Sequence, residues 1–162
     1  NTRFQFKLNH SNQYFANGKD ELELLISANK GVNFGELKKV ASGGEMSRIM
    51  LSVKAILSEY LKLPTIIFDE IDTGVSGDVS RKMAEIMQQM SENMQVISIT
   101  HLPQIAAKGK QHYKVFKQDI GNNIVTQLKV LSEEERISEI AEMLGGKNIT
   151  TTAIEHAKEL LS

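Results

Sequence analysis

The stretch that decides the fold covers residues 40–48 and reads Val40-Ala41-Ser42-Gly43-Gly44-Glu45-Met46-Ser47-Arg48. Ser42 and Glu45 have the spacing of a capping box, in which two side chains satisfy each other's backbone N–H groups at a helix start. The remaining N–H groups and the helix dipole would suit a phosphate. A ligand is not required, because serine caps helices well and glycine forms turns readily. Two glycines directly after a cap weaken the helix, however, and a closely approaching phosphate would account for them.

Two apolar runs further along the chain end in polar side chains. Residues 65–68 lead into Asp69 and Glu70, and residues 95–100 lead into His101. Each run predicts a buried strand, and the carboxyl ends of strands are where open α/β sheets bind ligands. Spacing alone does not separate a catalytic acidic pair from a solvated one, and a single histidine is more often structural than functional. The two runs do predict that these three side chains share one edge of a sheet.

Hydrophobic periodicity predicts the remaining strands and the last helices. Alternation of Phe4, Phe6 and Leu8 with polar residues indicates a half-exposed strand, and a second strand is expected over 22–27, before a loop over 31–39. A hairpin is expected from 113–116 and 124–130. Two helices follow over 133–144 and 151–161, with glycines 145 and 146 ending the first. Strands that alternate with helices predict an α/β fold with a mainly parallel sheet flanked by helices.

Two further helices are expected on either side of the first apolar run. The helix after Ser42 stops before Pro64 and has an apolar face of Met46, Ile49, Met50, Val53, Leu57 and Leu61. The helix after Gly77 is expected to turn inward Val79, Met83, Ile86, Met87 and Met90. The methionines among them are most simply core filler, because their flexible side chains fill irregular gaps.

Length and composition indicate one globular domain over residues 1–162. The chain has 162 residues, of which 41% are hydrophobic, so it is long enough to bury a core. The formal net charge is −1, whereas a dedicated DNA-binding domain is usually clearly basic. The absence of cysteine excludes disulfides and thiolate metal sites. The apolar runs are far shorter than the ~20 residues of a membrane span.

In this order, the motifs resemble those of the ATPase heads of the ABC/SMC class. Residues 41–48 correspond to the signature motif, 65–70 to Walker B, 73–77 to the D-loop and His101 to the switch histidine. Four segments, 41–50, 69–77, 100–107 and 139–146, are more narrowly similar to SMC-like proteins of bacterial DNA repair. The resemblance runs from about Leu24 to the end of the sequence. It implies a lobe of a P-loop ATPase head.

The sequence contains no Gly-x-x-x-x-Gly-Lys-Ser/Thr phosphate loop and no heptad run. SMC-like proteins place that loop, Walker A, in an N-terminal half-head, separated from the C-terminal half by a long antiparallel coiled coil. The resemblance therefore implies that residues 1–162 are the C-terminal lobe of a split head. Its partners would be the N-terminal Walker A half and, through ATP, a second protomer.

The resemblance also implies roles for individual residues. Asp69 would hold Mg²⁺ through a water, because Mg²⁺ keeps much of its hydration shell. Glu70 would orient or deprotonate the attacking water, and His101 would sense the γ-phosphate and hold that water in line. The signature would contact the γ-phosphate of ATP held by the other protomer, through Ser42, Gly43, Gly44 and Glu45. Ser76 is assigned to the nucleotide site as well, where transporter ATPases carry an aspartate.

The implied function is that of an ATPase head acting in DNA double-strand-break repair and recombination, with ATP and Mg²⁺ as cofactors. DNA would be bound by the full-length protein, in the cytoplasm at the nucleoid and without a membrane. This chain alone is expected to be inactive because Walker A is missing. A non-catalytic dimerisation or scaffold lobe is the main alternative, and an intact Asp69–Glu70 pair argues against it. A transporter subunit is disfavoured by Ser76 and by Glu45, where transporters commonly carry glutamine.

Overall fold

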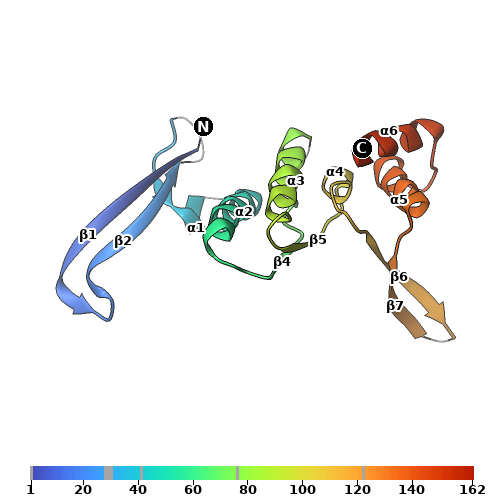
Figure 1. Cartoon of the computed structure of the whole chain (residues 1–162). Coiled ribbons are helices and arrows are strands. Elements are labelled where there is room, and N and C mark those ends of the chain that lie inside the picture. Colours follow the sequence, from blue (N-terminus) through green and yellow to red (C-terminus); the bar gives the residue numbers. More distant parts are fainter. Residues whose placement is uncertain (1, 28–30, 41, 76, 122) are drawn as a thin grey trace. The chain divides into compact units, whose positions relative to one another are not determined.

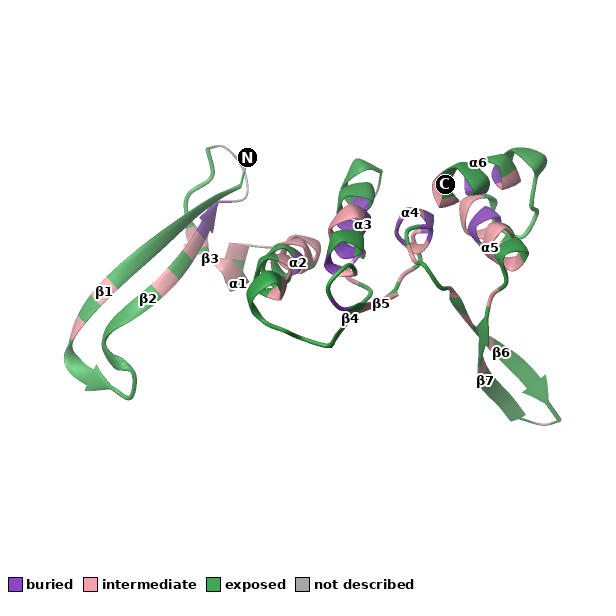
Figure 2. Ribbon diagram, in the orientation of Figure 1, coloured by how far each residue is buried: buried purple, intermediate pink, exposed green. Residues whose placement is uncertain are grey.

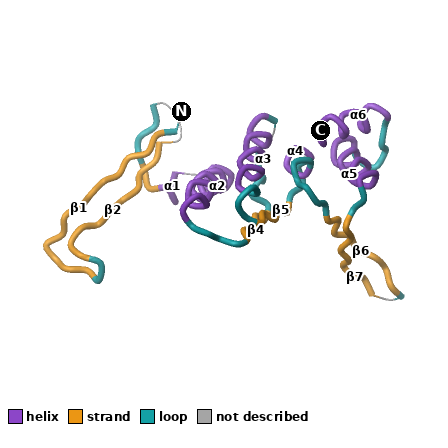
Figure 3. The backbone as a smooth tube through the Cα atoms, viewed as in Figure 1, coloured by secondary structure: helices purple, strands orange, loops and turns teal. Residues whose placement is uncertain are grey.

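The computed structural model describes residues 2–27, 31–40, 42–75, 77–121 and 123–162. The chain divides into two compact units, Asn1–Met50 and Leu51–Ser162, and each is described by itself (Figure 1). Strands and helices both contribute to the chain (Figure 3), so the predicted α/β class is confirmed. No helix among the described residues is both long and apolar enough to cross a membrane.

The first unit is built on a long antiparallel hairpin. β1 (Arg3–Phe15) pairs with β2 (Gly18–Ser27), and a short β3 (Gly35–Glu36) adds to the other side of β2. α1 (Leu37–Val40) follows, and α2 (Gly43–Tyr60) begins here and continues into the second unit. The two predicted strands are confirmed. The prediction of a loop over 31–39 is wrong for its last residues, which form β3 and α1. β3 pairs with the backbone groups near the end of β2, which would otherwise have no partner.

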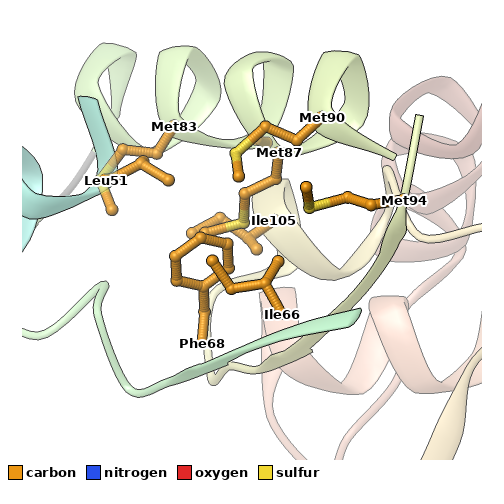
Figure 4. Close-up of a cluster of buried hydrophobic side chains, with 9 residues drawn as sticks. Leu51, Ile66, Phe68, Met83, Met87, Met90, Met94 and Ile105 are labelled. Carbon is orange, nitrogen blue, oxygen red and sulfur yellow. The ribbon is translucent and has the colours of Figure 1, made fainter. Parts of the chain in front are cut away.

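The second unit contains one parallel strand pair. β4 (Thr65–Asp69) lies in register beside β5 (Gln95–Ile99), and α3 (Asp78–Met90) connects them. Methionines of α3 pack on the inner side chains of β4 (Figure 4). This core also includes Ile105 of α4 (Pro103–Ala106), and its buried members are Leu51, Ile66, Phe68, Met83, Ala84, Met87, Met90, Met94 and Ile105.

β4 is buried on one face only, and β5 is half-buried on its inner face. Ile66 and Phe68 are buried, whereas Ile67 between them is 63% exposed. On β5, Ile97 and Ile99 are exposed as well. Buried residues, purple in Figure 2, are seen on α3, which packs on the other face. The prediction of fully buried strands is therefore wrong for the second face. The physical reason is that the packed residues of α3 and α4 meet only the face carrying Ile66 and Phe68.

The predicted apolar faces of the two helices also need correction. In α3 the inward methionines are confirmed, but Val79 is exposed. In α2 the buried residue is Leu51, which lies outside the predicted face, while most members of that face are exposed: Met50, Val53, Leu57 and Leu61. Helical spacing identifies an apolar face but does not determine what covers it.

The rest of the second unit is antiparallel and helical. β6 (Tyr113–Ile120) and β7 (Asn123–Val130) form the predicted hairpin, whose position 122 lies outside the described residues. α5 (Glu133–Gly145) and α6 (Thr151–Leu161) follow as predicted and share a second small core around Ile140 and Ala157. Among the described residues, parallel pairing is thus confined to β4 and β5, and the parallel part of the fold is smaller than predicted.

Candidate functional site

The predicted capping box at the start of α2 is present. The backbone N–H of Ser42 donates to Glu45 Oε2 at 2.9 Å, and the N–H of Glu45 points back to Ser42 Oγ at 3.4 Å. The Ser42 hydroxyl also donates to Glu45 Oε2, at 2.9 Å. These hydrogen bonds from the Ser42 backbone and side chain lower the pKa of Glu45. Glu45 therefore holds Ser42 in place, and its anionic carboxylate is already engaged within the turn.

Gly43 has no local reason to be glycine. A Cβ built on it meets no atom of the described residues within 4 Å, and its backbone is outside the left-handed region. An alanine in this helical position would normally be more stable by up to ~1 kcal/mol. A group from outside the chain that approaches the backbone would account for a glycine here.

A second capping box, at the start of α5, provides a comparison. Ser132 and Glu135 exchange the same two backbone hydrogen bonds. The first turn of α5, however, carries three glutamates at positions 133, 134 and 135, whereas the first turn of α2 carries only Glu45. Because like charges repel, an anion would be disfavoured at α5. The turn at α2 combines a cap with two glycines and suits a phosphate better.

Asp69, Glu70 and His101 share one sheet edge, as predicted. Asp69 and Ile99 are partners in the β4–β5 register, and the backbone N–H of Glu70 donates to Ile99 O at 3.1 Å. His101 follows β5 by two residues and precedes α4, which has Pro103 at its start. The shared edge brings together two exposed carboxylates and an imidazole whose side chain is 64% exposed. The three groups are accessible to solvent.

The backbone of Glu70 is in the left-handed region, with φ at 46°. It is the one non-glycine residue with positive φ in the described part of the chain. Thr73 secures the turn by donating from its N–H (3.3 Å) and its hydroxyl (2.9 Å) to Glu70 O. Such conformations are costly and cluster at functional sites. No signal in the sequence points to this strain, because glutamate has no preference for positive φ.

Asp72 belongs to the site but is not among the predicted site residues. Its side chain is 1% exposed, and its Oδ2 accepts a hydrogen bond from the Thr100 hydroxyl. His101 Nδ1 lies 3.7 Å from the same oxygen. The signal that could have found it is an aspartate two residues after the acidic pair together with a hydroxyl directly before the histidine.

The predicted nucleotide residues fall into separate groups. Asp69, Glu70 and His101 are brought together in the second unit. The signature residues lie in the first unit: Ser42, Gly43, Gly44 and Glu45. Ser76, also assigned to the nucleotide site, lies outside the described residues.

The donor set at the sheet edge fits Mg²⁺ that arrives with a nucleotide. Within the described residues, no three acidic or histidine side chains lie close enough to hold a metal by themselves. Mg²⁺ keeps several waters and is commonly held by one or two carboxylates together with phosphate oxygens. The exposed Asp69 at the end of β4 can provide such a carboxylate.

Comparison with known proteins gives sequence relatives but no matching family model. The chain is 46% identical over 145 residues to the DNA repair protein RecN of Halalkalibacterium halodurans, covering 90% of this chain and 26% of that protein. It is 38% identical over 162 residues to RecN of Haemophilus influenzae, covering 99% of this chain and 29% of that protein. The chain thus spans roughly a quarter of the length of these curated relatives.

Solved structures share the fold at lower identity. The Smc head domain of Pyrococcus yayanosii, with a coiled coil and joint, matches with a TM-score of 0.67 and 21% identity, over 87% of this chain and 26% of that one. A chain from work on ATP-driven dimerisation and DNA-stimulated activation of SMC ATPases matches with a TM-score of 0.56 and 20% identity, over 76% of this chain and 73% of that one. Similarity to RecN across most of the sequence identifies this chain as a RecN-type segment, and its fold is that of the Smc head domains.

Proposed function

We propose that this chain is the signature and Walker B lobe of a Mg²⁺-dependent ATPase head that acts in DNA double-strand-break repair and recombination. The observation that carries the proposal is the shared edge of β4 and β5, where Asp69 and Glu70 end one strand and His101 follows the other. Asp69 holds the metal, Glu70 orients the attacking water and His101 faces the γ-phosphate. When Mg²⁺ is bound, it neutralises charge that develops on the phosphate oxygens.

The head is complete only with an N-terminal half that supplies the phosphate loop. Its backbone cradle and lysine hold the β- and γ-phosphates, and the present sequence contains no such loop. The exposed apolar face of β4 and β5 supports this assembly, because a two-stranded sheet is normally covered on both faces in a parallel arrangement. We propose that residues 1–162 form one lobe of that split head, in a protein of the cytoplasm and nucleoid.

ATP binding then joins two heads through their signatures. Ser42 and Gly43 at the start of α2 approach the γ-phosphate of ATP held by the opposite protomer. The absence of a local requirement for glycine at position 43 supports this approach from outside. ATP-driven dimerisation is the subject of the work on SMC ATPases that gave one of the similar structures. DNA binding belongs to the full-length protein, because this lobe has a net charge of −1.

Mixing two inactive variants of the complete head tests the shared site. One variant carries Ser42→Arg and the other Glu70→Gln, and each alone should hydrolyse little ATP. If the signature acts in trans, a mixed pair contains one site with an intact Glu70 and an intact signature, and a second site with both lesions. Hydrolysis should then recover toward half of the wild-type rate. If the signature acts in cis, every site carries one lesion and no activity returns.

The same variants separate an enzyme from a non-catalytic scaffold. Glu70→Gln should bind ATP and accumulate as paired heads, because only the hydrolytic step is lost. Asp69→Asn should weaken engagement of Mg²⁺-ATP itself. A scaffold lobe would pair equally well with or without ATP, and Glu70→Gln would change neither pairing nor nucleotide turnover.

A further inference from the structure

Asp72 is a buried carboxylate, and only one of its two side-chain oxygens has a hydrogen-bond partner among the described residues. It lies two residues beyond Glu70 and is 1% exposed. Its Oδ1 has no hydrogen-bond partner within the described residues. Burial of an ionisable group with an unsatisfied oxygen is costly, and such a group calls for an explanation.

The other oxygen of Asp72 holds the turn that carries His101. Thr100 donates its hydroxyl proton to Asp72 Oδ2, and the same hydroxyl oxygen accepts the N–H of Leu102 at 3.0 Å. Asp72 and Thr100 thus secure the backbone on both sides of His101. The connection spans the two loops at the sheet edge, because Asp72 follows β4 and Thr100 follows β5.

The imidazole itself lies next to the same carboxylate. His101 Nδ1 is 3.7 Å from Asp72 Oδ2, which is too long for a hydrogen bond. The exposed ring can shorten this distance by a small rotation, and catalytic hydrogen bonds commonly tighten when substrate engages. A carboxylate that accepts the Nδ1 proton fixes both the tautomer and the orientation of a histidine ring.

We propose that Asp72 is the positioning residue for His101: it accepts a hydrogen bond from Nδ1–H and leaves the unprotonated Nε2, on the far side of the ring, to accept a hydrogen bond from the attacking water. Thr100 assists by holding the Asp72 carboxylate in place. The inference rests on the proposed ATPase function of this edge. Asp72 does not touch the nucleotide and acts through His101.

A double-mutant cycle in the complete head tests this role. Asp72→Asn keeps the size of the side chain but replaces the anionic acceptor with a neutral amide, so kcat should fall about 10- to 100-fold with little change in KM for ATP. In a His101→Gln background, Asp72→Asn should cost almost nothing further. Losses that multiply would overturn the proposal. Asp119→Asn, on the exposed part of β6, is the matched control and should leave kcat unchanged.

A spectroscopic measurement distinguishes this inference from the proposed function. Long-range ¹H–¹⁵N spectra of the unmutated head should show His101 as the Nδ1–H tautomer, and a wild-type Nε2–H tautomer would overturn the role of Asp72 whatever the activity. If His101→Gln retains full activity while the Nδ1–H tautomer is observed, the catalytic role of His101 fails and the positioning contact stands. Should Asp72→Asn not fold, Thr100→Val should lower kcat and Thr100→Ser should restore it. An equal kcat in these two Thr100 variants would contradict the proposed clamp.

Discussion

Glu70 holds a backbone conformation that glutamate rarely adopts, with φ at 46°. For an L-residue the left-handed region costs roughly 1–2 kcal/mol, whereas glycine reaches it freely. Glu70→Gly should therefore be more stable than Glu70→Ala by about 1 kcal/mol, which reverses the usual order of these residues. Both variants should lose ATP hydrolysis in the complete head. Urea unfolding checks the stability order, and an alanine variant at least as stable as the glycine variant would contradict the strained turn.

His112 provides a pH-dependent property unrelated to nucleotide. Burial and then the neighbouring Arg136 charge lower the pKa of His112 from its usual 6.5, and its Nε2 has no hydrogen-bond partner among the described residues. The unfolded chain therefore binds a proton that the folded chain does not, once the pH falls below about 6.5. Stability should decrease as the pH falls from 6.5 to the lower folded-state pKa.

The control for this pH effect is His112→Gln, which cannot titrate. The free energy of unfolding should fall between pH 7.5 and pH 5.5 by a larger amount in the wild-type protein than in this variant. Parallel pH profiles for the two proteins would show that His112 is not responsible.

At the scale of elements, the two capping boxes allow stability to be separated from ligand binding. Ser42→Ala and Ser132→Ala should each destabilise the protein by about 1 kcal/mol, because each removes a cap. Hydrogen bonds from Ser42 lower the pKa of Glu45, and a hydrogen bond from Lys129 does most to lower the pKa of Glu135. The stabilisation that accompanies each lowered glutamate pKa is thus present above about pH 4.5. It is lost as the pH falls through the lower folded-state pKa of that glutamate.

Only the box at α2 should matter for head pairing. Gly43→Ala should raise the stability of the protein by up to ~1 kcal/mol, because a Cβ there meets no described atom and alanine favours helices. The same substitution should weaken ATP-driven pairing, which light scattering or crosslinking can measure. Ser132→Ala is the control, since it should lower stability without changing pairing. A stabilised Gly43→Ala variant that pairs normally would remove the signature from the nucleotide site.

At the scale of the whole molecule, the exposed face of β4 and β5 predicts a context-dependent substitution. Ile67 is 63% exposed in this chain, so Ile67→Thr should change its stability by less than about 0.5 kcal/mol. In the complete head the phosphate-loop half should cover this face, and the same substitution should cost roughly 1–3 kcal/mol. Ile66→Thr, on the buried face, is the control and should destabilise both forms. Equal, small effects of Ile67→Thr in both would argue against such coverage.

ATP hydrolysis is also a property expected of the complete head rather than of this chain alone. Purified alone, this chain should hydrolyse ATP negligibly, because it carries no phosphate loop to hold the β- and γ-phosphates. Colorimetric phosphate release measures this directly. Robust Mg²⁺-dependent turnover that Glu70→Gln abolishes would show that the chain holds nucleotide in another way.

Local sequence determined most of the individual elements. The Ser42–Glu45 capping box, the β6–β7 hairpin and the last two helices follow from spacing, turn residues and periodicity within a few residues of each other. The convergence of Asp69 and His101 was also predictable, because parallel strands end at the same edge of a sheet. Such features depend on neighbours along the chain or on a general rule of topology.

Tertiary structure alone decided which side chains are covered and which backbone is strained. In α2, Leu51 is buried rather than the predicted face. Asp72 is buried with a hydrogen bond from Thr100, and the backbone of Glu70 is in the left-handed region. None of these follows from periodicity, because burial depends on which distant segment packs against a face. Glu70 takes a positive φ where the chain turns away from β4, while its N–H still pairs with Ile99 on the neighbouring strand. The positions of the motifs along the strands and helices were thus determined by the sequence. The burial and backbone conformation of their residues were determined by contacts between segments about 30 residues apart.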